Sequence, residues 1–190
     1  MLYDGVQPPF IEKFKAMGKK DLRPYFQWFL CKIPDGISEL VGEVRRVHIY
    51  EDWQPDCTPD SLDLLGEWFS QIVETRQRTY LELEELRYNS PFPVDISTEE
   101  LTDRTFSLSV DMAMYVSQVF IRSFPSLRWD QPFGSKRFIS YGQPVLIPFD
   151  CGEFNPVHMM VTLAYGLVAK RKTGARLRAI FDIWSTKVIS

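Results

Sequence analysis

Apolar residues recur at the spacing of an α-helix along the first quarter of the chain. A first stripe over residues 22–33 predicts a helix with Asp21 as its N-cap. Pro34 is expected to end this helix, because proline in a helix interior removes a backbone hydrogen bond. A second stripe over residues 37–47 predicts a second helix. The two helices would then form an antiparallel hairpin.

Three further helices follow from start signals and apolar stripes. Thr58-Pro59 provides an N-cap and a proline in the first turn for a helix that continues to about residue 74, and residues 79–88 form another helical stretch. A capping box at residues 97–100 opens the longest helix, which reaches about Ser123. The second half of that helix is apolar nearly all round, so we expect it at the centre of the fold.

The last third of the chain mixes strands and helices. Short stretches rich in β-branched and aromatic residues, at 127–129, 136–141 and 144–149, lie between glycine and proline turns and predict two or three antiparallel strands. Asn155-Pro156 begins another helix, and residues 177–188 form the last. The pattern predicts a helix-dominated α+β fold of about six or seven helices, with a small antiparallel sheet near residues 127–149.

Composition places this pattern in one globular domain spanning residues 1–190. Apolar residues make up 45% of the chain and charged residues 25%, which is typical of folded proteins. There is no internal repeat, no signal-peptide pattern and no apolar run long enough to cross a membrane. The three cysteines form no CxxC pair and no disulfide framework, so we expect reduced thiols in a cytoplasmic protein without a membrane role.

Charge is distributed unevenly. Residues 1–95 carry 11 basic and 17 acidic side chains, whereas residues 96–190 carry 11 and 8. The acidic half suggests a surface for a basic protein partner, formed by Glu39, Glu43, Glu51, Asp52 and Asp56. The alternative is an anion-binding surface near the C-terminus, formed by Lys170, Arg171, Lys172, Arg176 and Arg178. Nucleic acid is not the expected partner, because the net charge of the whole chain is −3 and the basic stretch is short.

One stretch could hold catalytic chemistry. Cys151 follows a predicted strand and precedes a helix, where a thiol can become nucleophilic, and His158 could act as its base. Asp150 and Glu153 lie beside it, so a small cysteine-dependent hydrolase or transferase is an alternative function. The structural interpretation is that Gly152 makes a turn and the carboxylates favour the positive end of the helix.

Known nucleotide-binding, hydrolase and metal-binding motifs do not occur in the sequence. His48 and His158 are the only histidines, and neither belongs to a pair of ligands with zinc-site spacing, so neither a metal nor a cofactor is expected. Asp111 is unusual because it lies in the most apolar part of the predicted central helix. Such a carboxyl needs an ion-pair partner, for which Arg104, Arg128 or Arg137 could serve, or it takes up a proton.

Two stretches carry a resemblance to known proteins. One runs from Ser107 through Phe124-Pro125 to Trp129, and the other combines residues 142–149 with Phe154-Asn155-Pro156. Their order resembles that in small, uncharacterised bacterial cytosolic proteins, some of which are similar to immunity proteins of toxin systems. The resemblance implies a non-enzymatic protein that binds another protein. It implies no catalytic residues, and the oligomeric state stays open.

Overall fold

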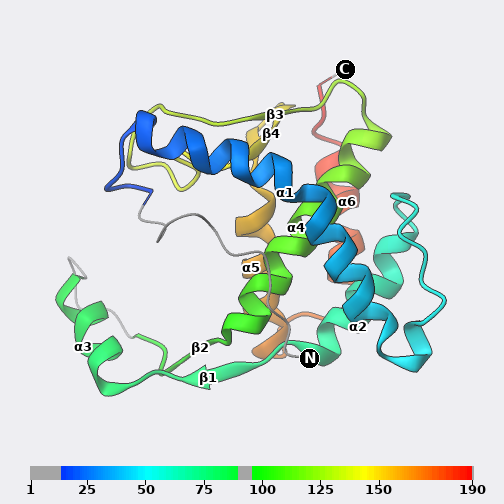
Figure 1. Cartoon of the computed structure of the whole chain (residues 1–190), viewed down its shortest axis with the longest axis horizontal. Coiled ribbons are helices and arrows are strands. Elements are labelled where there is room, and N and C mark those ends of the chain that lie inside the picture. Colours follow the sequence, from blue (N-terminus) through cyan, green and yellow to red (C-terminus); the bar gives the residue numbers. More distant parts are fainter. Residues whose placement is uncertain (1–13, 90–95, 190) are drawn as a thin grey trace.

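The structure is a computed structural model that describes residues 14–89 and 96–189 (Figure 1). These ranges contain six α-helices: α1 (Lys19–Arg45), α2 (Ser61–Ile72), α3 (Tyr80–Asn89), α4 (Asp103–Ser123), α5 (Pro156–Val168) and α6 (Arg176–Ser185). They also contain one short 3-10 helix, η1 (His48–Tyr50), and five strands: β1 (Thr75–Gln77), β2 (Glu99–Leu101), β3 (Arg128–Asp130), β4 (Val145–Phe149) and β5 (Gly152–Phe154). The predicted helix-dominated α+β fold is confirmed.

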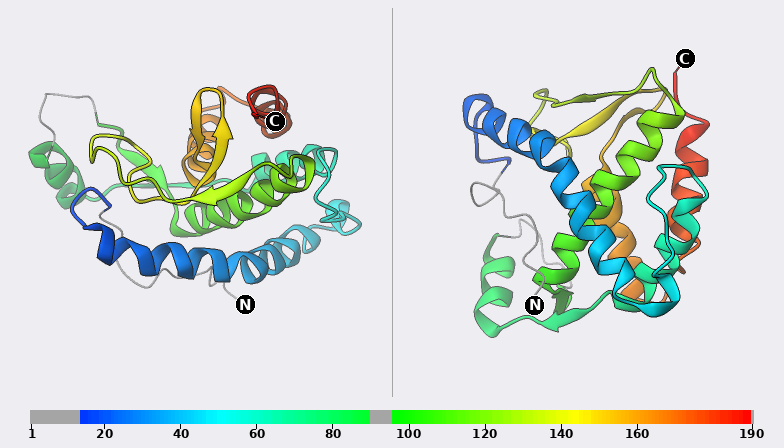
Figure 2. Two further views of the ribbon diagram at one scale, coloured as in Figure 1. Left: turned by 90° about the horizontal axis from the view of Figure 1, so that it is seen from above. Right: turned by 45° about the vertical axis from the view of Figure 1, so that its right-hand side comes forward.

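Helix α4 is the central helix of the molecule. It begins after Thr102, whose hydroxyl accepts a hydrogen bond from the Thr105 amide at 3.2 Å. Helix α1 crosses one side of α4, and α5 lies on the opposite side (Figure 2). Met114 packs with Phe29 of α1, whereas Phe120 packs against Phe154 and other aromatic rings beyond the opposite side. A helix that is apolar nearly all round requires such cover, so the prediction of a buried central helix is confirmed.

Helix α1 is continuous over 27 residues, which corrects the predicted hairpin. Pro34 lies inside the helix on its exposed side. Burial of large apolar side chains from Phe29 to Leu40, at ~1.5–3 kcal/mol each, outweighs the ~3 kcal/mol that an interior proline costs. The predicted N-cap is also wrong. Gly18 is the N-cap, and Asp21 lies in the first turn, where its carboxylate accepts a hydrogen bond from the Gly18 amide.

A two-stranded antiparallel sheet, β1 with β2, was not predicted. Thr75 pairs with Leu101 and Gln77 with Glu99. The predicted capping box at residues 97–100 is therefore wrong, because Glu99 and Glu100 belong to a strand and the long helix begins after Thr102. Pairing with a distant strand prevailed over a local helix-start pattern.

The second sheet has three antiparallel strands in the order β3–β4–β5. The predicted strands at 127–129 and 144–149 are confirmed. The third strand is β5, whereas residues 136–141 form turns and leave Phe138 and Ile139 exposed. Gly152 makes the tight connection from β4 to β5 with φ +117°, a backbone conformation that favours glycine.

Helices α5 and α6 complete the core. The side chain of Asn155 accepts a hydrogen bond from the His158 amide at 3.0 Å, which confirms the predicted start of α5. Helix α6 packs against α2 where Gly66 meets the turn at Gly174. Helix α2 begins at Ser61 and not directly after Thr58, because residues 58–61 form a separate turn. No described helix is both long and apolar enough to cross a membrane.

Candidate functional site

The Cys151 region does not form a catalytic arrangement among the described residues. Cys151 is exposed in the turn between β4 and β5, and no hydrogen bond joins its sulfur to the His158 ring within the described part of the chain. His158 instead lines a cavity of about 180 Å³ together with Phe14, Tyr25 and other residues.

Asp150 and Glu153, the two carboxylates of this region, do not complete a catalytic arrangement with Cys151 either. Asp150 lies 3.7 Å from the Lys187 ammonium, and Glu153 is half-buried on β5. This geometry favours the structural interpretation of the stretch, in which Gly152 turns the chain and Asn155 caps α5.

The five predicted acidic binding residues do not form one exposed surface. Glu43 is only 5% exposed and forms ion pairs with Arg46 and, at 2.9 Å, with Arg104. It is therefore part of the α1–α4 packing and is removed from the predicted surface. Long-range pairing with Arg104 decides this, and the local sequence contains no sign of it.

The other acidic residues are exposed along the end of α1 and the following loop. Glu39 and Asp52 are exposed, and the Glu51 carboxylate lies 2.8 Å from Nδ1 of His48. Asp56 organises the turn before α2. Its carboxylate accepts hydrogen bonds from the Thr58 amide at 2.8 Å and the Thr58 hydroxyl at 2.7 Å, and these bonds lower its pKa.

The basic stretch near the C-terminus separates into two groups. Arg178 forms ion pairs with Asp60 at 2.8 Å, with Asp182 at 3.0 Å and with Asp63 at 3.4 Å. It therefore ties α6 to the start of α2. The other four predicted cations line one shallow cavity between α5 and α6: Lys170, Arg171, Lys172 and Arg176.

Asp111 is fully buried on α4, at the crossing with α1. An added Cβ on Gly36 would lie 2.7 Å from its Oδ1 atom, so the helices meet closely at this point. Burial raises the pKa of Asp111 to about 8. Arg104, one of its predicted partners, pairs with Glu43 instead. A pKa of about 8 means that the carboxyl is mainly protonated at neutral pH.

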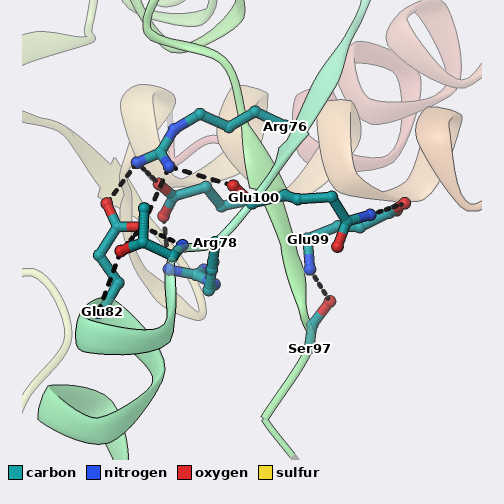
Figure 3. A network of polar contacts seen from close by, with 8 residues as sticks. Arg76, Arg78, Glu82, Ser97, Glu99 and Glu100 are labelled. Atoms are coloured by element: carbon teal, nitrogen blue, oxygen red, sulfur yellow. Dashed lines mark hydrogen bonds and ion pairs between the residues drawn. The ribbon is translucent and has the colours of Figure 1, made fainter.

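Helix α3 lies at one end of the molecule, away from the other helices, and β1 and β2 join it to the body (Figures 1 and 2). An ion-pair network anchors its first turn (Figure 3). Arg76 on β1 donates hydrogen bonds to Glu82 on α3 at 2.6 and 3.0 Å and pairs with Glu100 on β2. Arg78 pairs with the same Glu100. The hydrogen bonds from Arg76, followed by those from Thr79, lower the pKa of Glu82 to about 2.

The outer side of α3 exposes large apolar side chains. Tyr80 is 72% exposed, Leu81 78% and Tyr88 90%. At 100° per residue these three lie within an arc of about 140° that also holds Glu84 and Glu85. We call these five residues the α3 face. Exposed apolar groups that gather on one helix mark an interaction site more often than single exposed ones do.

The sequence predicted α3 as a helix but did not identify it as a site. The available signal was the arrangement of its apolar residues, which occur on both sides of the helix. Tyr80, Leu81 and Tyr88 lie on one side, and Leu83, which is half-buried, and Leu86, which is 38% exposed, lie on the other. Only one of these sides can face the body of the molecule.

Neither a metal site nor a similar protein helps to identify the functional site. Within residues 14–89 and 96–189, no group of three or more His, Cys, Asp or Glu side chains could hold a metal ion. Comparisons with models of protein families, with curated proteins and with solved structures found no match. A functional proposal therefore depends on the geometry of the chain itself.

Proposed function

We propose that this chain is a non-enzymatic interaction module, and that the α3 face docks into an apolar groove on a protein partner whose rim carries Lys or Arg. The observation that carries the proposal is the exposure of Tyr80, Leu81 and Tyr88 on one side of an outlying helix. Leu81 and Tyr88 are seven residues apart, which is one of the spacings at which helices that bind in grooves present apolar anchors.

The charge of the α3 face determines the class of partner. Glu84 and Glu85 are exposed between the apolar anchors, and Glu84 is held by Arg87 at 2.8 Å. Glu85 forms no ion pair within the described residues. A partner with a basic rim would match these carboxylates, and complementary charge speeds association and disfavours other partners.

The network in Figure 3 supports the proposal because it fixes α3 before binding. A short isolated helix of ten residues is only marginally stable in water. Arg76 and Glu82 hold its first turn to the β1–β2 sheet, so less conformational entropy is lost when the helix docks. Inhibition of a basic toxin by an immunity-like protein is a process in which such a surface would serve.

The α3 face is tested by affinity capture from a lysate of the source organism, with quantitative mass spectrometry at low and high salt. A protein captured by the wild type should be reduced at least about tenfold by Leu81→Ala/Tyr88→Ala, since central anchors commonly account for 2 kcal/mol or more. Glu85→Lys should weaken capture at low salt, where charge attraction is least screened.

Ile49→Ala is the matched control, because Ile49 is 70% exposed on η1, outside the α3 face. It should leave capture unchanged. The proposal is wrong if both sets of variants retain the same proteins in equal amounts. It is also wrong if the protein retained through Tyr88 is a second copy of this chain, because that partner carries the same acidic face.

A further inference from the structure

The cavity between α5 and α6 is lined by cations from three consecutive positions after α5 and one position at the start of α6. Lys170, Arg171, Lys172 and Arg176 surround a hollow of about 360 Å³ whose remaining lining comes from Thr173, Ala175 and Ala179. No acidic side chain takes part in this lining. The chain brings four positive charges to one concave surface, where each raises the electrostatic cost of the others.

None of these four cations forms an ion pair with a described carboxylate. Arg178, two residues beyond Arg176, shows the contrast. Its guanidinium is held by Asp60, Asp63 and Asp182, which raise its pKa. Arg178 is therefore neutralised within the fold, whereas no described carboxylate forms an ion pair with the cations of the cavity wall.

The backbone adds to the positive potential of the cavity. Helix α6 starts after Ala175, which offers no side-chain cap, and its first turn contains no acidic residue. The Arg176 and Leu177 amides donate hydrogen bonds to the Thr173 and Gly174 carbonyl oxygens. The helix start therefore contributes through the positive end of its dipole, which no acidic side chain of the first turn offsets. Gly66 and Gly174 are in close contact, which fixes the turn that leads into this helix.

We propose that this cavity binds the phosphate group of a small phosphorylated molecule. Arg171 and Arg176 would supply bidentate hydrogen bonds to phosphate oxygens, and Lys170 and Lys172 would supply point charges. The cations converge on one hollow and are not spread along a track. That arrangement suits one or two phosphate groups better than a nucleic-acid backbone, which needs contacts at successive phosphates.

The probe for this site is inorganic pyrophosphate, titrated into the full-length protein by calorimetry at constant ionic strength. We expect saturable binding with one site, together with a rise in the melting temperature as the probe concentration increases. Lys170→Gln/Arg176→Gln should weaken the affinity at least about tenfold, because it removes two charge-assisted contacts. Equal affinity in this variant and the wild type would overturn the proposal.

Arg178→Gln is the matched control, since it removes a neighbouring arginine that belongs to ion pairs outside the cavity lining. It should leave pyrophosphate affinity unchanged. Arg87→Gln on α3 serves the same purpose if Arg178→Gln does not fold. Binding of a 20-nucleotide single-stranded DNA or of phosphatidic acid vesicles more than about tenfold tighter than pyrophosphate would contradict a small ligand. Failure of this test leaves the α3 proposal intact, because the two sites share no residue.

Discussion

Asp111→Asn is expected to raise the free energy of unfolding at pH 7 by about 2–4 kcal/mol. The wild-type carboxyl is buried on α4 and has a pKa raised to about 8, whereas in the unfolded chain it ionises near 3.8. At pH 7 folding must therefore take a proton from water, at a cost of about 1.4 kcal/mol for each pH unit above 3.8. Asparagine has nearly the same shape and needs no proton. Chemical denaturation of both proteins measures the difference.

The stability of the wild type is expected to fall as pH rises from about 4 to 8, which gives the effect of Asp111→Asn its sign. Below about pH 4 the carboxyl is protonated in both states and contributes no pH dependence. Between pH 4 and 8 the unfolded chain releases the proton and the folded chain keeps it, so wild-type stability falls as pH rises. Above about pH 8 both states are ionised and the effect levels off. The stability difference between Asp111→Asn and the wild type should grow over this window.

Asp52→Asn is the control, because Asp52 is exposed in the loop after η1 and its removal should change stability little at any pH. Denaturation curves of Asp111→Asn and wild type that shift in parallel from pH 4 to 8 would show that Asp111 ionises normally in the folded protein. That outcome would contradict the assignment of a protonated carboxyl at the α1–α4 crossing.

Gly66→Ala and Gly42→Ala are expected to change stability in opposite directions. A Cβ on Gly66 would lie 2.9 Å from the Leu177 Cβ and closer still to the Gly174 carbonyl oxygen, so α2 and α6 must move apart. We expect a loss of about 3 kcal/mol, the upper part of the usual range for overpacking. A Cβ on Gly42 meets nothing within 4 Å. There alanine should add ~0.5–1 kcal/mol, because it favours the helix.

Urea denaturation of the two variants beside the wild type checks this pair. Both changes add one methyl group to a helical glycine, so a common effect of alanine on the unfolded chain cancels. Effects of the same sign would contradict the close α2–α6 packing. Gly66→Ala should also weaken pyrophosphate binding, because Gly174 belongs to the turn that carries the cations of the cavity.

The sequence predicted those elements whose determinants are local. The apolar period identified α4, α5 and α6, and Asn155-Pro156 marked the start of α5 as the structure has it. The errors occur where distant contacts decide. Pro34 ends no helix because its neighbours bury apolar side chains against α4, and residues 97–100 do not cap a helix because β2 pairs with β1.

The candidate sites were also predicted correctly where local sequence decides and wrongly where distant contacts decide. The sequence grouped the basic residues after α5 correctly as a cluster, but it could not separate Arg178, whose partners Asp60 and Asp63 lie more than 100 residues away. It placed Glu43 on a binding surface because its partner Arg104 lies 61 residues away in the sequence. The exposure of Leu81 and Tyr88 depends on where α3 lies relative to the body, which no local pattern specifies.

The most direct test of the proposed function is photo-crosslinking from the α3 face. A photoreactive phenylalanine analogue replaces Tyr88 in one protein and Ile49 in another, and both are irradiated in a lysate of the source organism. We predict one main crosslinked protein from position 88, absent from position 49, with the crosslinked peptide next to Lys or Arg residues in a groove. Equal crosslinking from both positions, or crosslinking from position 88 only to acidic surfaces, would contradict docking through the α3 face.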